Sequence, residues 1–411
     1  MQFFSNFTSA FRKDSKYQLF FLSVLTVGLS YGLYKGIIDN YLAEAVVMTE
    51  FDKGVSEFFR ELPGLLLVFI LAAFYMLSAE TLYKLGAVIM LAGMMMQTVV
   101  PANKVMVILA IIVFSLGDHI QLGMRTTLTL EYAKEGRSGG ALGYISSIMQ
   151  GGQLIGFLII SAAFLFISGV SAYRMIFAVA TVLIAFGAVF AFRLNGHSET
   201  DTTKQRFYFR KKYTKYYFLE VFYGARKQVF FTFGPYVLIL FYGASTSVIS
   251  LLFAISAIFS FLLSPVIGKI IDRLGYKIVM VSDTLILVIV CFFYGFAHRI
   301  FPINVAFLVC CVNYVLDSII SLASIASNVY VHELADTPEE ARATISTGLS
   351  VNHLITILIA LFGGWIWRTL GMEMLFVLSA LLGLCNSAYA ATIRSPKKSY
   401  EGKRNGNQSF L

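Results

Sequence analysis

The sequence predicts an all-α polytopic membrane protein whose twelve transmembrane helices form two pseudo-symmetric six-helix bundles. The 411 residues are 58% hydrophobic and only 13% charged, whereas soluble domains carry about 25% charged residues. Twelve apolar stretches reach the roughly 20 residues that a membrane-spanning helix needs, and they lack the polar–apolar alternation of barrel strands. A polar, basic segment at 194–215 separates the first six stretches from the last six.

The predicted organisation has four parts: a bundle over 1–193, a cytoplasmic linker over 194–215, a second bundle over 216–394 and a disordered tail over 395–411. In the first bundle, helices are expected at about 16–38, from 57 onward, 82–100, 104–126, 139–167 and 172–193. In the second they are expected at about 215–242, 246–267, 277–298, 303–329, 342–367 and 372–393. An acidic loop is expected between the first two helices, carrying Asp39, Glu44, Glu50, Asp52 and Glu57.

The positive charge is distributed unevenly between the two sides of the predicted membrane. Twelve spans place both termini on one side, and most of the 32 Lys and Arg residues fall in the loops and tails of that side. Positively charged loops are typical of the cytoplasmic side. We therefore expect a multi-pass protein of the plasma membrane, of the bacterial inner-membrane kind, with both termini cytoplasmic. The net charge of +9 does not indicate a nucleic-acid partner.

No pattern of residues points to catalysis. The four cysteines lie in predicted spans without metal-ligand or redox spacing, and no Walker-type phosphate loop is present. No nucleophile–base set is apparent. We expect neither an enzyme, nor a cofactor, nor a metal.

Weak repeats relate the two halves. Tyr31-Gly-Leu-Tyr-Lys35 in the first helix is matched by Tyr223-Gly-Ala-Arg-Lys227 in the seventh. Asp118 and Asp317 take equivalent positions in the fourth and tenth helices, as do Gln153 and His353 in the fifth and eleventh. Matches that keep helix order indicate a parallel repeat about an axis along the membrane normal.

One loop carries a family resemblance. Between the eighth and ninth helices the sequence Gly268-Lys-Ile-Ile-Asp272-Arg273-Leu-Gly275-Tyr-Lys277 resembles the G-x-x-x-D-R-x-G-x-K/R loop of the major facilitator superfamily. The resemblance implies two six-helix halves that rock around a central site, with this loop as a gate. The corresponding first-half loop, residues 79–86, lacks the first glycine and the aspartate.

The same resemblance implies that helices 1, 4, 7 and 10 line the cavity. Lys35, Asp118 with His119, Arg226 with Lys227, and Asp317 lie on these helices. Because opposite charges in low dielectric stabilise each other, we expect pairs Lys35–Asp118 and Lys227–Asp317. Arg226 then remains for a substrate anion, or else forms a structural salt bridge. The expected substrate-binding set is Arg226, Lys227, Lys35, Tyr31 and Tyr223.

Proton coupling is assigned to buried titratable groups, since a carboxylate desolvated between helices can hold a proton near working pH. The candidates are Asp118, Asp317, Glu220, His119 and His353. For each histidine the alternative is a hydrogen-bonded packing residue.

These features predict a monomeric secondary transporter that moves a small organic anion or zwitterion by alternating access, together with a proton. A multidrug or lipid exporter is the alternative, favoured by a wide apolar cavity and an arginine held in a bridge between helices. A membrane sensor or assembly partner with a transporter fold is the alternative from another class.

Overall fold

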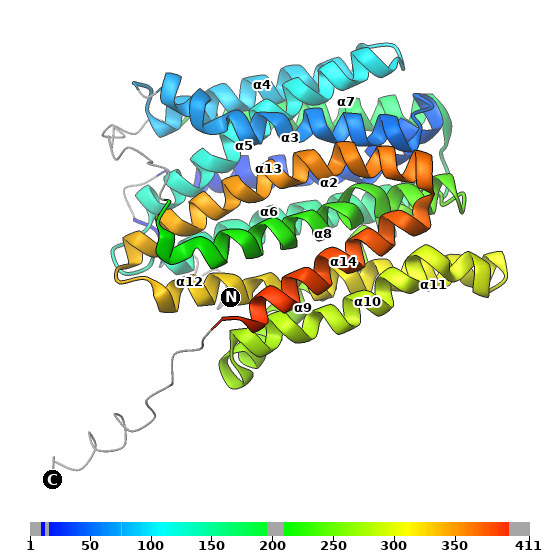
Figure 1. Ribbon diagram of the computed structural model, residues 1–411. Coiled ribbons are helices and arrows are strands. Elements are labelled where there is room, and N and C mark those ends of the chain that lie inside the picture. The colour runs from blue at the N-terminus through cyan, green and yellow to red at the C-terminus, as the bar shows by residue number, and fades with distance from the viewer. Residues whose placement is uncertain (1–9, 13–15, 75, 195–208, 394–411) are drawn as a thin grey trace, which may run out of the picture.

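The computed structural model describes residues 10–12, 16–74, 76–194 and 209–393, and it is all-helical in layout (Figure 1). Most of the predicted linker and all of the predicted tail therefore lie outside the described residues. The first half comprises α2 (Tyr17–Asn40, continued by η1, Tyr41–Ala45), α3 (Glu50–Ala73), α4 (Ala79–Val99), α5 (Lys104–Tyr132), α6 (Ser138–Ala163) and α7 (Gly169–Phe192).

The second half begins with η2 (Lys211–Tyr213) and comprises α8 (Thr214–Leu240), α9 (Thr246–Leu274), α10 (Tyr276–Ile300), α11 (Ile303–Ile320), η3 (Ser321–Ser324), α12 (Ile325–Leu334), α13 (Pro338–Leu370) and α14 (Met372–Ala391). Because α11, η3 and α12 form one continuous span, the described chain has the twelve predicted membrane-length helices. The predicted fold class is confirmed.

Ten of these helices are long and apolar enough to cross a membrane by composition alone. The two others are α3 and α8, whose middles carry several charged residues. Charged groups at membrane depth are costly, so they mark pathways and paired networks. These two helices are therefore where the functional site is to be sought.

The predicted acidic loop before α3 is wrong. Asp39 lies in α2, and α3 begins at Glu50, seven residues earlier than expected, so that Glu57 lies well inside it. Thr49 starts this helix with a capping box, in which its side chain accepts from the Asp52 backbone and Asp52 accepts from the Thr49 backbone. Such a box satisfies two otherwise unpaired backbone donors, and Lys53, Glu57 and Glu61 consequently share one helical face.

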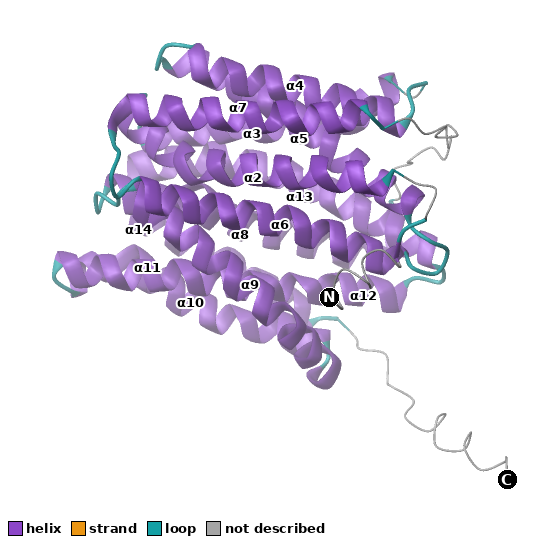
Figure 2. Cartoon of the chain, turned by 180° about the vertical axis from the view of Figure 1, so that it is seen from behind, coloured by secondary structure: helices purple, strands orange, loops and turns teal. Residues whose placement is uncertain are grey.

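The two halves are joined at the end opposite the termini, where the loops α2–α3 and α8–α9 lie. There Asn40 Nδ2 donates to the Ala244 carbonyl (2.9 Å) and Tyr236 donates to the Met48 carbonyl (2.7 Å). Helices α6 and α9 are joined by hydrogen bonds from Ser247 and Ser250 to backbone carbonyls of α6. Helices far apart in sequence thus lie side by side through the middle of the molecule (Figure 2).

Helices α3 and α13 approach closely at the same end. A Cβ added to Gly54 would lie 2.4 Å from the Ala360 carbonyl oxygen, and one on Gly364 would lie 2.9 Å from the Glu50 carbonyl oxygen. Small residues at such crossings let helix backbones come together and pack. This seam forms a second joint between the halves.

At the end that carries the termini, no hydrogen bond or ion pair joins the halves within the described residues. The motif residues Asp272 and Arg273 are exposed there, without an ion pair among the described side chains, and a Cβ on Gly268 would meet nothing within 4 Å. Gly275 has φ +84°, where glycine is favoured, and forms the turn from α9 to α10 with Lys277 just after it. The predicted gating residues Asp272 and Arg273 therefore make no contact with the first half through an ion pair among the described residues.

The degenerate first-half loop is tied to its own half. Lys84 donates to the Leu194 carbonyl at 2.6 Å, and Tyr132 donates to Glu80 at 2.8 Å. These bonds fix the end of α4 against α5 and α7. This loop, which lacks the aspartate and the first glycine of the motif, is thus attached to its own half by two hydrogen bonds.

Gly54→Ala should lower the stability of the closed seam, because the added methyl overpacks against the α13 backbone and overpacking costs about 1–3 kcal/mol. Gly151→Ala is the matched control, since a Cβ on Gly151 of α6 meets nothing within 4 Å, and a helical Gly→Ala change is neutral or stabilising. Thermal unfolding in detergent should show a lower Tm for the first variant only. Equal Tm values would contradict the close approach.

Candidate functional site

A continuous series of buried ionic contacts runs along α2 and α3. Lys35 Nζ lies 2.9 Å from Asp39 Oδ2, and Lys53 Nζ lies 2.7 Å from both Asp39 Oδ1 and Glu57 Oε1. Arg60 Nε continues it to Glu57 Oε2 at 2.6 Å, and Arg60 also bonds Glu61. We call these six residues the charge chain: Lys35, Asp39, Lys53, Glu57, Arg60 and Glu61.

Helical spacing explains the order of the charge chain. Lys35 and Asp39 are four residues apart on α2, as are Lys53 and Glu57 on α3, so each pair shares a helical face. Asp39 and Lys53, each with a side chain only 1% exposed, join the two helices. Three cations alternate with three carboxylates. An unpaired buried charge is strongly unfavourable, so this neutral alternation is what allows α3 to lie in the membrane.

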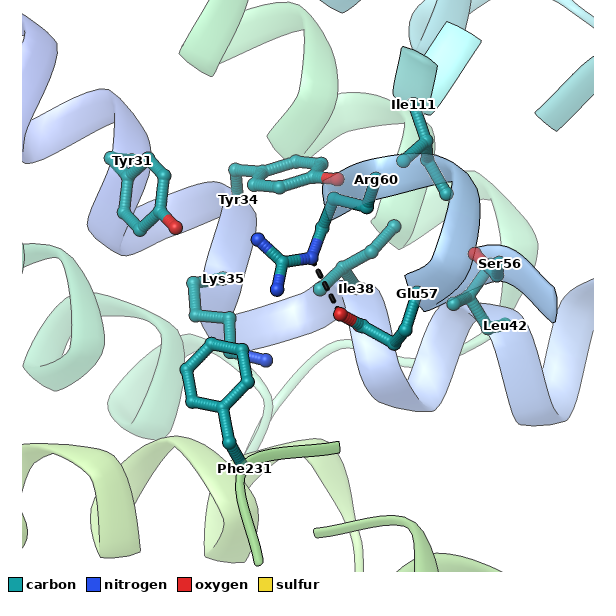
Figure 3. Close-up of a pocket in the computed structure, with 10 residues that line it drawn as sticks. All are labelled: Tyr31, Tyr34, Lys35, Ile38, Leu42, Ser56, Glu57, Arg60, Ile111 and Phe231. Carbon is teal, nitrogen blue, oxygen red and sulfur yellow. Dashed lines mark hydrogen bonds and ion pairs between the residues drawn. The ribbon is translucent and has the colours of Figure 1, made fainter. Parts of the chain in front are cut away.

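The charge chain borders a small cavity of about 20 Å³ (Figure 3), enough for one water-sized group. Tyr31, Tyr34 and Lys35 reach it from α2, Glu57 and Arg60 from α3, and Phe231 from α8 of the other half (Figure 3). Phe231 contacts both cations: its ring centre is 5.1 Å from Lys35 Nζ and 5.2 Å from Arg60 Cζ. Cation–π attraction therefore adds to the contact between the halves.

The charge chain ends on the second half. His353 of α13 approaches Glu61, with Nδ1 3.0 Å from Oε2. The His353 ring centre lies 5.7 Å from that of His119 of α5. Glu61, His119 and His353 place one donor atom each within 4.8 Å of one another. The expectation that the chain holds no metal-ligand grouping overlooked this set, because its members come from three distant helices.

Asp118 and Lys227 are two of the charged residues inside helices that make no ion pair in the described part of the chain. Asp118, half-buried on α5, has no hydrogen-bond partner, and Lys227 is exposed on α8. Both lie about halfway along helices of 29 and 27 residues. Lys227 shares a helical face with Tyr223, which donates to the Ser321 carbonyl at 2.7 Å, and with Phe231, which meets the first half. Lys227 therefore lies on the face of α8 that also carries Phe231, the residue that contacts Lys35 and Arg60 of the first half.

A second pair of charges lies about 10 Å nearer the termini, at seven residues along a helix that rises 1.5 Å per residue. Arg125 follows Asp118 on α5, half-buried and without an ion pair among the described residues, and Glu220 precedes Lys227 on α8. Glu220 is held by Ser327 (3.0 Å) and Asn352 (3.3 Å). Each depth thus carries one carboxylate and one cation, contributed by opposite halves.

Arg226 is buried within the second half, which corrects the prediction that it is the first contact for a substrate anion. It is 1% exposed, lies 3.3 Å from Asp283 of α10, and stacks at 5.0 Å from the Tyr223 ring. Its Nε and Nη1 are buried without a hydrogen-bond partner. One residue along a helix turns a side chain by about 100°, so Arg226 points into the second half while Lys227 points out of it. The structural salt bridge was the correct alternative.

The two predicted charge pairs are also corrected. Lys35 bonds Asp39 on its own helix rather than Asp118 on α5, because four residues along a helix bring the groups together without crossing the bundle. Lys227 is exposed and makes no ion pair with the buried Asp317, although Lys227 and Arg226 are the cations that attract this carboxyl group. Asp317 Oδ1 has no hydrogen-bond partner.

Sequence reasoning missed Lys53, Glu57, Arg60 and Glu61 because they were assigned to a loop and the first turn of a helix. The signal was present: Thr49 and Asp52 form a helix-start pattern, and opposite charges follow at four-residue spacing. Asp283 and Arg125 carried no such local signal.

The comparisons with known proteins follow this geometry. The family model described as the Major Facilitator Superfamily matches residues 216–410. No curated protein matches the chain. A crystal structure of the nucleoside transporter NupG is 17% identical with a TM-score of 0.72, covering 93% of this chain and 99% of that one.

Two further solved structures are similar. A D-xylose-proton symporter is 14% identical with a TM-score of 0.70, covering 93% of this chain and 98% of that chain. An auto-inhibited POT family peptide transporter is 10% identical with a TM-score of 0.73, with the same coverage. At these identities the likeness shows the fold.

The fold of the whole chain is that of these solved membrane transporters. Residues 216–410 match the family model of the Major Facilitator Superfamily, the family that the Asp272–Arg273 loop resembles.

Lys53→Met should destabilise the protein by about 3–5 kcal/mol, because it leaves the buried Asp39 and Glu57 without their shared cation. Lys104→Met is the matched control: its contact with Asp52 is solvent-accessible, and such pairs contribute about 0–1 kcal/mol. Chemical unfolding in detergent measures both. A small loss for Lys53→Met would mean that the charge chain is not structural.

Proposed function

We propose that this transporter carries a small zwitterion or organic anion, held at mid-membrane between Lys227 and Asp118. The observation that carries the proposal is that both groups lie about halfway along helices of opposite halves and make no ion pair with any described residue, whereas Lys35, Lys53, Arg60 and Arg226 are all engaged. Lys227 would bind a carboxylate and Asp118 an ammonium group. A zwitterion satisfies both; an anion satisfies Lys227 alone.

Alternating access would follow from the arrangement of the joints. Hydrogen bonds attach the halves at the end opposite the termini, and Asp272 and Arg273 are exposed at the other end. We place the termini on the cytoplasmic side of the plasma membrane, as the positive loops indicate. A solute that binds both halves more tightly in an intermediate state lowers the cost of rocking between the two conformers.

Proton coupling is proposed for Asp317 and Glu220. Asp317 is buried on α11 beside, but not bonded to, Arg226 and Lys227, and Glu220 accepts hydrogen bonds from neutral donors only. A buried carboxyl group without a bonded cation is stabilised by taking up a proton. Because Lys227 acts on both carboxyl groups, solute and proton binding would be linked through it.

The multidrug or lipid exporter is retained for one specific reason: Arg226 is held in a bridge between helices. The charged lining of the space between the halves argues against it, because an apolar solute would leave Lys227 and Asp118 desolvated and unpaired.

Lys227→Gln should reduce uptake by about tenfold or more, since a hydrogen bond to a charged group is worth about 1.5–3 kcal/mol. The measurement is uptake into proteoliposomes with an imposed pH gradient, across amino acids, monocarboxylates, amines and neutral sugars. Zwitterions or anions should be accumulated. Uptake restricted to neutral or cationic solutes, unaffected by Lys227→Gln, would refute the assignment.

Two variants serve as controls in that assay. Lys212→Gln removes a cation that pairs with the exposed Asp336 at 2.8 Å and with Glu340 at 3.9 Å, both outside the membrane, and uptake should be unchanged. Arg226→Gln removes a buried bridge, so it should lower Tm without selectively weakening solute affinity. A specific rise in KM for Arg226→Gln would restore the original assignment of the anion contact to that residue.

Asp317→Asn should make uptake independent of the pH gradient while leaving exchange of internal for external solute intact, because exchange needs no net proton movement. Glu220→Gln tests the second carrier in the same way. The two readouts are gradient-driven accumulation and counterflow in the same vesicles. Full accumulation in both variants would exclude these carboxyl groups as proton carriers.

A further inference from the structure

We propose that Glu61, His119 and His353 bind a divalent transition-metal ion such as Zn²⁺ or Co²⁺, which clamps the two halves in the conformer described here. The three residues come from α3, α5 and α13, so the site spans both halves. It is separate from the solute contacts proposed above.

The donor set suits such an ion. Two imidazoles and a carboxylate are typical ligands of Zn²⁺ in sites that leave a position open. Bonds of about 2.1 Å in tetrahedral geometry separate ligand atoms by about 3.4 Å. The Glu61–His353 contact is already 3.0 Å, and all three donor atoms lie within 4.8 Å of one another. A small inward movement of His119 completes the set.

His119 is prepared for this role by its own hydrogen bonds. Its Nδ1 lies 2.8 Å from the Ser115 carbonyl oxygen, which can only accept, so Nδ1 carries the hydrogen. The lone pair therefore remains on Nε2. Metal-binding histidines are oriented in this way by a carbonyl or carboxylate behind the ring. Among the described residues Nε2 has no hydrogen-bond partner.

Gly64 keeps the space in front of Nε2 open. A Cβ at this position on α3 would lie 2.6 Å from His119 Nε2 and 3.4 Å from His353 Cε1. Any other residue would occupy the volume that the two rings face. The short distances from a Cβ at this position to the two rings explain why position 64 is a glycine.

The surrounding charge permits a cation. Arg60 lies next to Glu61 but is balanced by Glu57 and Glu61 within the neutral charge chain. Asp118, adjacent to His119 and without an ion pair in the described chain, adds an unbalanced negative charge. His353 is 32% exposed, which gives an ion access from the space between the halves.

The clamp follows from the origin of the ligands. Glu61 and His119 move with the first half and His353 with the second, and the α3–α13 seam holds them together. When the end opposite the termini opens, α3 and α13 separate and the set is divided. An ion that binds one conformer shifts the population toward it by its differential affinity.

The first test is a titration of the full-length protein in detergent with Co²⁺, followed by its visible spectrum, and with Zn²⁺ by calorimetry. Wild type should bind one ion. His119→Gln and His353→Gln should each weaken binding by about tenfold or more, at least the loss seen for second-shell changes. The proposed site would be overturned if wild type bound no ion. It would also be overturned if the double variant His119→Gln/His353→Gln bound the ion as tightly as wild type.

Two matched variants separate ligand loss from misfolding. His298→Gln removes a histidine near Glu373 on α14, at the end opposite the termini, and should bind the ion as wild type does. Gly64→Ala leaves all three ligands in place but fills the space they face, and should weaken binding too. Loss of binding in His298→Gln would point to a site elsewhere.

The clamp is tested by spin labels at Val99 and Ile303, exposed residues of the two halves at the end opposite the termini. In wild type, Zn²⁺ should narrow the distribution of distances between the two labels to its short component. In His353→Gln, Zn²⁺ should leave that distribution unchanged. An ion that binds without altering the distribution would refute the clamp. These readouts use no transported solute, so their failure is distinct from failure of the transport proposal.

Discussion

The alternation of charge from Lys35 to Glu61 is the constraint on which the rest of the structure depends. Isolated charges at this depth would each cost several kcal/mol, yet Lys53 and Asp39 are almost fully buried. Their pairing allows a helix with too many charges for an ordinary span to cross beside α2. The charge chain reaches the second half through the contact between Glu61 and His353. The same residues therefore neutralise buried charge and join the two halves.

This arrangement separates structural charges from available ones. In the first half the cations of α2 and α3 are engaged by neighbouring carboxylates, and in the second half Arg226 is engaged by Asp283. Asp118 of the first half and Lys227 of the second are among the charged groups that make no ion pair in the described chain. A solute is recognised by groups that lack a protein partner, because a satisfied ion pair gains little from exchanging one partner for another.

The contacts that join the halves lie at the end opposite the termini and at the centre of the molecule. Hydrogen bonds to backbone carbonyls and close glycine contacts hold the end opposite the termini, while the family loop at the other end is free. Glu61 and the two histidines lie at the inner limit of the joined region. An ion bound there would act on the equilibrium between conformers, because its ligands come from α3, α5 and α13 of the two halves.

The sequence by itself determined the class of fold and the helix count, because hydrophobic length is a local property. One short motif, the Asp272–Arg273 loop, also carried the resemblance to the family whose model matches residues 216–410. The sequence also singled out Lys227, Asp118 and Glu220, on which the proposed function rests. Only the tertiary structure decided which charges pair. Lys35 pairs with Asp39, and Arg226 pairs with Asp283. Which charges meet in a bundle depends on the rotation and depth of each helix. Spacing along the sequence specifies neighbours within one helix but not between helices. For the same reason the meeting of Glu61, His119 and His353 could not be read from the chain: their positions become neighbours only when three helices from two halves converge.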